Sequence, residues 1–393
     1  MLVSFPPMGV YETLFKFLAA SGQYMGSPGT HPWAQGYPLT TPVPGGPKLP
    51  SAISLTADDL KYPQAAGNEP LRRAIADYYR RFYDAGITYE NVAIFAGGRP
   101  GIWATLAFLR PEVEVLVEET EYTPYFDVLR LLARAHRIVP SREENRFRPT
   151  LADYEITAQK LVHPFLLKSN PCNPTGVTVA GDALRKLVEW SATTGRGALF
   201  DEAYEFFADP KPVSALEFVG DIEATDIFVA GAATKGLQAP GIRVGWIVAA
   251  KRHIDQFRNW SSIGMGGVSR PSQIYALQLL ELERVGHARR AIAEFFTSQR
   301  RRYAQGLAQL GLELYSGDGG FYHWARLPGG LTADALNERL FAERAAILPG
   351  TLCDMMRRGD ASPLAKFVRF SFGPLGPESY ESDLAILARC VKR

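Results

Sequence analysis

The chain has 393 residues, of which 46% are hydrophobic and 21% are charged. This composition is ordinary for a globular protein, and the length allows a large core and two domains. Lys and Arg together number 43 and Asp and Glu 41, so the net charge is +2. A balance this close to zero gives no support for nucleic acid or an acidic macromolecule as the main partner.

Cysteine usage and the first segment of the chain bear on the cellular compartment. Cys172, Cys353 and Cys390 are far apart in the sequence and match neither a metal-site spacing nor a disulfide framework. We therefore expect a reducing cytoplasm and no metal. Prolines and charges interrupt the apolar residues of positions 1–22, so we expect no signal peptide and no membrane span there.

The N-terminal part is rich in Pro and Gly, most clearly in PVPGGPKLP at 42–50. It predicts an extended arm with one short helix near residues 10–21. NEPLRRAIADYYRRFYDAG then predicts an amphipathic helix, because apolar residues recur in it at helical spacing. These apolar residues are Leu71, Ile75, Tyr78 and Phe82.

After this helix, short apolar runs alternate with helical stretches. The expected strands are NVAIFAGG, VEVLVEE, PFLLKS, GALFDEA, TDIFVAGAA and RVGWIVAA, and the helices include RPGIWATLAFLR and TPYFDVLRLLARA. Nearly continuous apolar strands separated by helices indicate a mostly parallel, doubly wound sheet that helices cover on both faces.

From about residue 270 the pattern becomes helical, in PSQIYALQLLELERV and RAIAEFFTSQRRRYAQGLAQLG. Strands return at GFYHWARL, AAILPG and FVRFSFG, which indicates a smaller α+β domain. We therefore expect an arm over residues 1–45 that joins the small domain, a large domain over 46–280 and a small domain over 281–393.

The loop KSNPCNPTGVTV, residues 168–179, contains two Asn-Pro pairs. Proline fixes its own φ and restricts the residue before it, so this loop is stiff. It presents the side chains of Asn170 and Asn173 in set directions. Such a loop suits either the binding of a planar polar ligand or an ordinary tight turn, and the loop alone does not decide between them.

Polar residues and glycines gather at the ends of the predicted strands. Ligands of open α/β sheets bind beyond the carboxyl ends of the strands, so these residues are the candidates for a site. Asn170 and Asn173 follow PFLLKS, Asp201 and Tyr204 close GALF, Lys235 follows TDIFVAGAA, and Gly97 and Gly98 close NVAIFA before a helix. One edge of the sheet would thus carry amides, a carboxylate, an amine and a helix N-terminus.

Several motifs together resemble one family. NPCNPTG, DEAY and TKGLQAPGIRVG resemble, in order and spacing, the fold-type I aminotransferases of class I/II, which use pyridoxal 5′-phosphate (PLP). KYPQAAGNEPLR and FVRFSFG match as well, and the resemblance covers nearly the whole chain. It implies a large PLP-binding domain with a doubly wound sheet and a smaller α+β domain.

The resemblance assigns three catalytic residues. Lys235 is the amine that forms an imine with the aldehyde of PLP, and it later moves a proton. Asp201 pairs with the ring nitrogen and keeps it protonated, which makes the ring an electron sink. Tyr204 donates to the ring oxygen, as does Asn173, which also touches the substrate carboxylate. Asn170 is expected to tie the loop together.

The resemblance also assigns a phosphate site. Its members are Gly97 and Gly98 at a helix N-terminus, the hydroxyl of Thr234 and the planar fork of Arg243. Ala232 departs from the family pattern, which often has Ser three residues before the lysine. One phosphate donor is therefore expected to be missing, and we expect Arg99 to compensate.

Four further residues have implied roles. Tyr122 matches the aromatic residue that stacks on the PLP ring, and Tyr62 matches a tyrosine that reaches the phosphate of a neighbouring subunit. The latter implies a homodimer. Arg369 matches the arginine that binds the substrate α-carboxylate, and Gly36 a glycine whose backbone N–H meets the same carboxylate.

The sequence thus predicts a transaminase that moves an amino group between an L-amino acid and a 2-oxo acid, without a nucleic-acid or membrane partner. The aromatic arm favours a neutral or aromatic substrate side chain. One alternative keeps PLP but changes the reaction, as in a lyase, a cyclase or another biosynthetic enzyme of this fold. A second is a non-catalytic sensor fused to a DNA-binding domain, for which the segment before Tyr62 is short and rich in proline.

Overall fold

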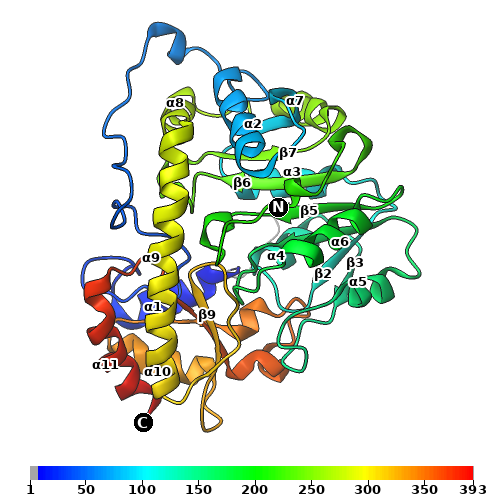
Figure 1. Ribbon diagram of the computed structural model, residues 1–393. Coiled ribbons are helices and arrows are strands. Elements are labelled where there is room, and N and C mark those ends of the chain that lie inside the picture. Colours follow the sequence, from blue (N-terminus) through cyan, green and yellow to red (C-terminus); the bar gives the residue numbers. More distant parts are fainter. Residues whose placement is uncertain (1–7, 393) are drawn as a thin grey trace, which may run out of the picture.

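The computed structural model describes residues 8–392, and two β-sheets organise this part of the chain (Figure 1). The outermost residues of the predicted arm and of the predicted small domain lie outside this range. The larger sheet contains β1 (Val92–Phe95), β2 (Glu114–Glu118), β3 (His136–Val139), β4 (Pro164–Ser169), β5 (Gly197–Asp201), β6 (Ile227–Ala232) and β7 (Gly245–Val248). The smaller sheet contains β8 (Glu313–Leu314), β9 (Tyr322–Arg326), β10 (Leu348–Pro349) and β11 (Phe367–Ser371).

The larger sheet has the order β1-β7-β6-β5-β4-β2-β3. Only β7 runs antiparallel to its two neighbours, β1 and β6. Two antiparallel pairings in succession leave β1 pointing the same way as β6. The carboxyl ends of β1, β4, β5 and β6 therefore share one edge of the sheet, as the predicted site requires. The expected mostly parallel large sheet with a smaller α+β unit is confirmed.

Helices cover both faces of the larger sheet (Figure 1). The α-helices of the described residues are α1 (Val10–Ser21), α2 (Glu69–Tyr83), α3 (Gly98–Phe108), α4 (Pro124–Leu131), α5 (Leu151–Ala158), α6 (Gly181–Ser191), α7 (Lys251–Gly264), α8 (Arg270–Leu279), α9 (Leu282–Gln309), α10 (Ala333–Ala342) and α11 (Tyr380–Val391). On β2, Leu116 packs in the same cluster as residues of α2, α6 and α9. Val115 and Val117 pack with residues of α3, α4 and α7. Burial on both faces explains why the strands read as continuous apolar runs.

The helical region after residue 270 differs from the prediction. We expected one helix through Val285 and another from Arg290, but the break lies at Leu280 and Glu281, and α9 is continuous over 28 residues. The carboxylate of Glu281 accepts from the backbone N–H groups of Glu283 and Arg284 and so caps α9. An apolar pattern that continues through the break conceals it in the sequence. In Figure 1, α9 runs alongside both sheets.

The proline-rich arm packs on the smaller sheet and its helices. The backbone of His31 bridges to Ala345, Ser371 donates from its N–H to the carbonyl of Trp33, and Leu39 donates to Gly373. These contacts join the arm to the smaller unit, while the predicted domain boundaries remain predictions. No helix among residues 8–392 is long and apolar enough to cross a membrane.

A buried charged cluster ties the segment after β5 to two helices. Arg289 of α9 forms a 2.7 Å ion pair with Glu205, and both side chains are nearly inaccessible. The hydroxyls of Tyr78 and Tyr83, from the α2 helix, donate to the same carboxylate. Burial raises the pKa of Glu205, and Arg289 opposes this rise. The cluster fixes the position of the residue next to Tyr204.

Substitution of Arg289 by Met is expected to lower the free energy of unfolding by about 3–5 kcal/mol, because it leaves the Glu205 carboxylate buried without a cation. Urea unfolding followed by circular dichroism measures this loss. The double variant Arg289→Met/Glu205→Gln removes both charges and should lose less than the single variant. A single variant as stable as the wild type would show that the pair does not hold these helices.

Candidate active site

Most of the residues predicted at the strand ends line one pocket. It lies at the carboxyl edge of the larger sheet, where the loops after β1, β4, β5 and β6 meet. The predicted residues that line it are Gly98, Arg99, Tyr122, Asn173, Asp201, Tyr204, Thr234, Lys235 and Arg243. The structure thus brings together an amine, a carboxylate, an amide, two aromatic rings and two guanidinium groups.

Lys235 lies at the centre of this arrangement. Its Nζ donates to the carbonyl of Gly36 in the arm and lies 5.7 Å from the ring centroid of Tyr204. Burial, together with the positive charges of Arg369 and Arg99, lowers the pKa of Lys235 to about 7, and the carboxylate of Asp201 opposes this shift. About half of this amine is therefore neutral near pH 7, whereas an ordinary lysine with a pKa of about 10.4 is almost fully charged. A neutral amine is a nucleophile.

Asp201 ends β5 as a buried carboxylate. Its Oδ2 accepts from the Tyr125 hydroxyl at 2.9 Å, and its Oδ1 accepts from the Ala203 N–H at 3.1 Å. Burial raises its pKa, and none of the described residues forms an ion pair with it. A buried carboxylate without a cation is costly, so this one suits a ligand with a protonated ring nitrogen.

The two asparagines of the stiff loop have different positions. Asn170 exchanges two hydrogen bonds with the backbone of Val179 and so ties the loop together, as expected. Asn173 points into the pocket, where its Nδ2 lies 3.5 Å from the Tyr204 hydroxyl and its Oδ1 accepts from Arg369 at 2.9 Å. The loop is therefore held together by Asn170, while Asn173 is left facing the pocket.

Arg369 contacts the pocket residue Asn173 from β11 of the smaller sheet. It is buried and donates to Asn173 and, at 2.6 Å, to the carbonyl of Ala34 in the arm. Its buried Nε has no partner among the described residues. Gly36 meets Lys235 through its carbonyl, and a side chain at this glycine would overlap the hydroxyl of Tyr322.

The other end of the pocket combines a helix N-terminus with two arginines. Gly97 precedes α3 with a φ of 102°, and a Cβ at this position would overlap the guanidinium of Arg243. Glycine is therefore required where the turn and the arginine meet. Arg99 forms no hydrogen bond or ion pair with the described residues. Free N–H groups and uncompensated positive charge suit a phosphate.

Four predicted site residues are not among those that line this pocket. Gly36, Gly97 and Arg369 each contact a residue that does line it, and the fourth residue is Tyr62. The side chain of Tyr62 is 96% exposed and lies outside it. Tyr62 therefore does not line the pocket of its own chain. Its expected contact with a neighbouring subunit stays a prediction.

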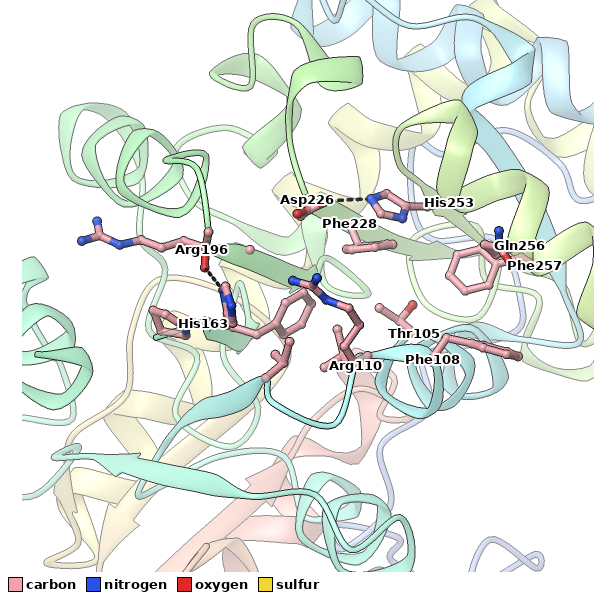
Figure 2. Close-up of a pocket in the computed structure, with 16 residues that line it drawn as sticks. Thr105, Phe108, Arg110, His163, Arg196, Asp226, Phe228, His253, Gln256 and Phe257 are labelled. Atoms are coloured by element: carbon pink, nitrogen blue, oxygen red, sulfur yellow. Dashed lines mark hydrogen bonds and ion pairs between the residues drawn. The ribbon is translucent and has the colours of Figure 1, made fainter. Parts of the chain in front are cut away.

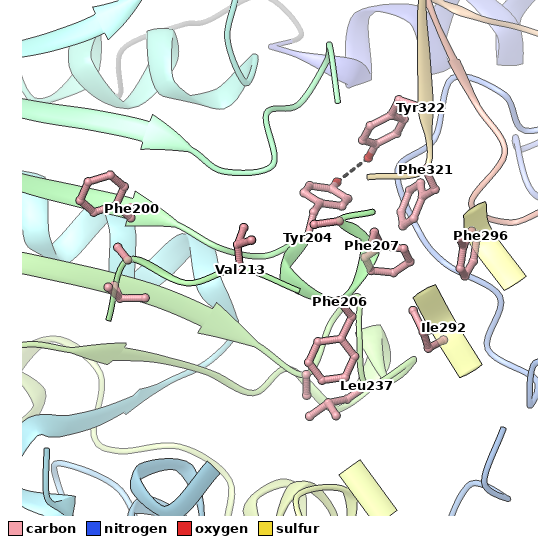
Figure 3. Close-up of a cluster of buried hydrophobic side chains, with 14 of the residues drawn as sticks. Phe200, Tyr204, Phe206, Phe207, Val213, Leu237, Ile292, Phe296, Phe321 and Tyr322 are labelled. Carbon is pink, nitrogen blue, oxygen red and sulfur yellow. Dashed lines mark hydrogen bonds between the residues drawn. The ribbon is translucent and has the colours of Figure 1, made fainter. Parts of the chain in front are cut away.

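Sequence reasoning missed three residues at the site. Ser169, the last residue of β4, accepts from the Asn173 N–H at 3.1 Å, and the strand-end rule that found Asp201 would have found it. Tyr125 holds Asp201 from the first turn of α4. Tyr322 of β9 pairs its hydroxyl with that of Tyr204 (Figure 3), and no local pattern in GFYHWARL marks it, because the contact joins two sheets.

A larger cavity of ≈ 400 Å³ lies at the opposite edge of the same sheet (Figure 2). Residues at the starts of β4, β5 and β6 line this cavity. Its carboxylate, Asp226, already has a partner, because its Oδ1 lies 2.8 Å from Nε2 of His253. It contains none of the predicted site residues. The site is therefore the smaller pocket at the carboxyl edge, where the complementary chemical groups converge.

The balance of charge at the site fits PLP. The cationic groups of Lys235, Arg99 and Arg243 line the pocket and Arg369 lies beside it, whereas Asp201 is the one carboxylate among the described residues that line it. The phosphate would face Arg243 and the start of α3, and the ring nitrogen would face Asp201. This excess of positive charge suits a phosphate together with a substrate carboxylate.

Comparison with known proteins agrees with this geometry. The family model described as "Aminotransferase class I and II" matches residues 40–380. The chain belongs to aminotransferase class I and II. PLP is the cofactor of this aminotransferase, and transamination is its reaction.

Individual relatives of this aminotransferase are distant. An aspartate aminotransferase of Pyrococcus horikoshii is 25% identical over 79% of this chain and 78% of its own length. An LL-diaminopimelate aminotransferase of Aquifex aeolicus is 28% identical over 74% of this chain and 75% of its own. The solved aspartate aminotransferase of Thermus thermophilus with maleate has a TM-score of 0.83 and 22% identity, covers 99% of this chain and 100% of its own, and shows the shared fold.

The lowered pKa of Lys235 predicts how the apoprotein takes up PLP. The uptake rate should rise with pH and reach half its maximum near pH 7, because the neutral amine is the reactive form. Stopped-flow absorbance of the visible band measures it. Removal of a nearby positive charge in Arg99→Gln should move the midpoint to higher pH. A midpoint near 10 in the wild type would show that the amine is an ordinary solvated lysine.

Proposed function

We propose that Lys235 is the catalytic amine of this aminotransferase, with Asp201 at the ring nitrogen of PLP and Tyr204 at its ring oxygen. When bound, PLP supplies an aldehyde that takes up the amino group and a ring that withdraws electrons from the substrate α-carbon. Lys235 Nζ, about half of which is neutral near pH 7, would take the proton from that carbon. The observation that carries this proposal is a half-buried amine of lowered pKa in the same pocket as a buried carboxylate without a cation among the described residues.

The phosphate of PLP is assigned to the start of α3, with Gly97 and Gly98, and to Thr234, Arg243 and Arg99. Arg99 offers a charge where Ala232 offers no hydroxyl, and this supports its compensating role. Tyr122 lines the same pocket, which supports its stacking on the ring, and Asn173 lies beside Tyr204 at the ring oxygen.

Arg369 is assigned to the α-carboxylate of the substrate, since its Nε is buried without a partner and its other nitrogens bond to groups that a carboxylate can replace. Asn173 and the backbone N–H of Gly36 would complete this carboxylate site. Beside Lys235 Nζ lie the rings of Tyr204 and, at 5.9 Å, Phe321. These aromatic surroundings support L-amino acids with uncharged side chains, and the corresponding 2-oxo acids, as substrates.

The assembly and the compartment are also proposals. Tyr62 is almost fully exposed, and an ion pair of 2.7 Å between Asp59 and Arg270 holds the segment beside it in place. These two observations support a homodimer in which Tyr62 reaches the partner's site. Cys172, Cys353 and Cys390 are all buried and none of them forms a disulfide, which supports a reducing cytoplasm.

The function is tested by titrating the PLP-loaded protein with single amino acids. Alanine, leucine or phenylalanine should bleach the visible band and yield one 2-oxo acid per site, and aspartate should do so far less well. Release of ammonia with the visible band restored would instead support a lyase. Faster bleaching by aspartate than by any uncharged amino acid would contradict the proposed substrate class.

Arg369→Lys tests the carboxylate site. Lysine keeps the charge but loses the planar pair of donors, so kcat/KM should fall about 10–100-fold, mainly through KM. Steady-state kinetics with a good amino donor measures the loss. Arg326→Lys, an exposed change on the neighbouring strand β9, is the matched control and should leave both constants unchanged. An unchanged KM in Arg369→Lys would remove this residue from the site.

A further inference from the structure

Tyr322 connects the two halves of the site. It lies on β9 of the smaller sheet, is fully buried, and forms a hydrogen bond between its hydroxyl and that of Tyr204 (Figure 3). The two rings are 5.4 Å apart and meet edge to face at 66°. The guanidinium carbon of Arg369 lies 4.3 Å from the centre of the Tyr322 ring. One side chain thus touches both the proposed ring-oxygen donor and the proposed carboxylate-binding arginine.

The hydrogen-bond inventory fixes the direction of the Tyr322–Tyr204 bond. A phenol has one proton to donate and lone pairs with which to accept. If Tyr204 gives its proton to the ring oxygen of PLP, it has none left for Tyr322. Tyr322 must then be the donor and Tyr204 the acceptor. The Tyr322 hydroxyl has no other hydrogen-bond partner among the described residues, so nothing competes for its proton.

The arm leaves room for this hydroxyl. A Cβ at Gly36 would overlap the Tyr322 oxygen, so the glycine allows the phenol to reach Tyr204. The carbonyl of the same glycine accepts from Lys235. The conformation of the arm at Gly36 therefore serves the Tyr322 contact as well as the amine.

We propose that Tyr322 is a positioning residue that donates to Tyr204, strengthens the donation of Tyr204 to the ring oxygen, and orients Arg369 with its ring. The inference rests on the proposed roles of Tyr204 and Arg369. When a hydroxyl accepts one hydrogen bond, its own O–H group is polarised, and the hydrogen bond that it donates is strengthened by roughly 10–30%. The phenol of Tyr322 thereby tunes the electron distribution of the cofactor without touching it.

The visible band of the PLP-loaded protein provides the readout. Its pH midpoint reports the proton on the nitrogen that joins Lys235 to the cofactor. Negative charge on the nearby ring oxygen stabilises the protonated form of this nitrogen, and a hydrogen bond donated by Tyr204 reduces that stabilisation. A weaker bond therefore keeps the proton to higher pH. Tyr322→Phe should raise the midpoint by a few tenths of a pH unit, and Tyr204→Phe should raise it more.

Kinetics separates the hydroxyl from the ring. Tyr322→Phe keeps the ring against Arg369, so KM for the amino acid should stay unchanged while kcat falls severalfold. Tyr322→Leu removes the ring as well, and KM should then rise severalfold. Tyr315→Phe is the matched control, because Tyr315 is a tyrosine of the smaller unit whose hydroxyl lies within hydrogen-bond distance of the carboxylates of Glu143 and Glu313, away from the pocket. It should leave the midpoint, kcat and KM unchanged.

A double variant tests the coupling directly. Gly36→Ala should displace the Tyr322 hydroxyl and raise the midpoint, and it should add nothing in the Tyr322→Phe background, where the hydroxyl is already absent. An unmoved midpoint in Tyr322→Phe, with a shifted one in Tyr204→Phe, would overturn the role of Tyr322 and leave that of Tyr204 intact. An unmoved midpoint in Tyr204→Phe would overturn both.

Discussion

The site depends on keeping the amine of Lys235 out of bulk water, so that about half of it is neutral near pH 7. Burial disfavours the ammonium form, and the guanidinium groups of Arg369 and Arg99 disfavour it further. The site also needs a negative group, and Asp201 provides a buried carboxylate that can pair with a cation. A reactive amine and an anionic group are thereby held in one pocket without neutralising each other through direct contact.

The fold makes this separation possible. Lys235 follows β6 and Asp201 ends β5, and these parallel neighbours deliver both residues to the same sheet edge. The smaller sheet and the arm then close the pocket from the other side, through Arg369 and the Gly36 carbonyl. Most contacts that define the site thus join elements far apart in the chain.

This division explains what the sequence predicts and what it conceals. Asp201, Asn173 and Lys235 follow apolar strands, so strand periodicity alone places them at one edge, and the family motifs add their roles. Tyr322 acts across two sheets, and its partner is not visible in any local pattern. The break between α8 and α9 is hidden for a related reason, since the cap at Glu281 interrupts an apolar pattern that continues unchanged.

The most direct measurement is borohydride reduction of the PLP-loaded protein followed by peptide mass spectrometry. The account predicts that the reduced cofactor is attached to one peptide, through Nζ of Lys235, and that Lys235→Ala carries no attached cofactor after the same treatment and dialysis. Attachment at another lysine, such as the buried Lys168, or no attachment in the wild-type protein, would contradict it.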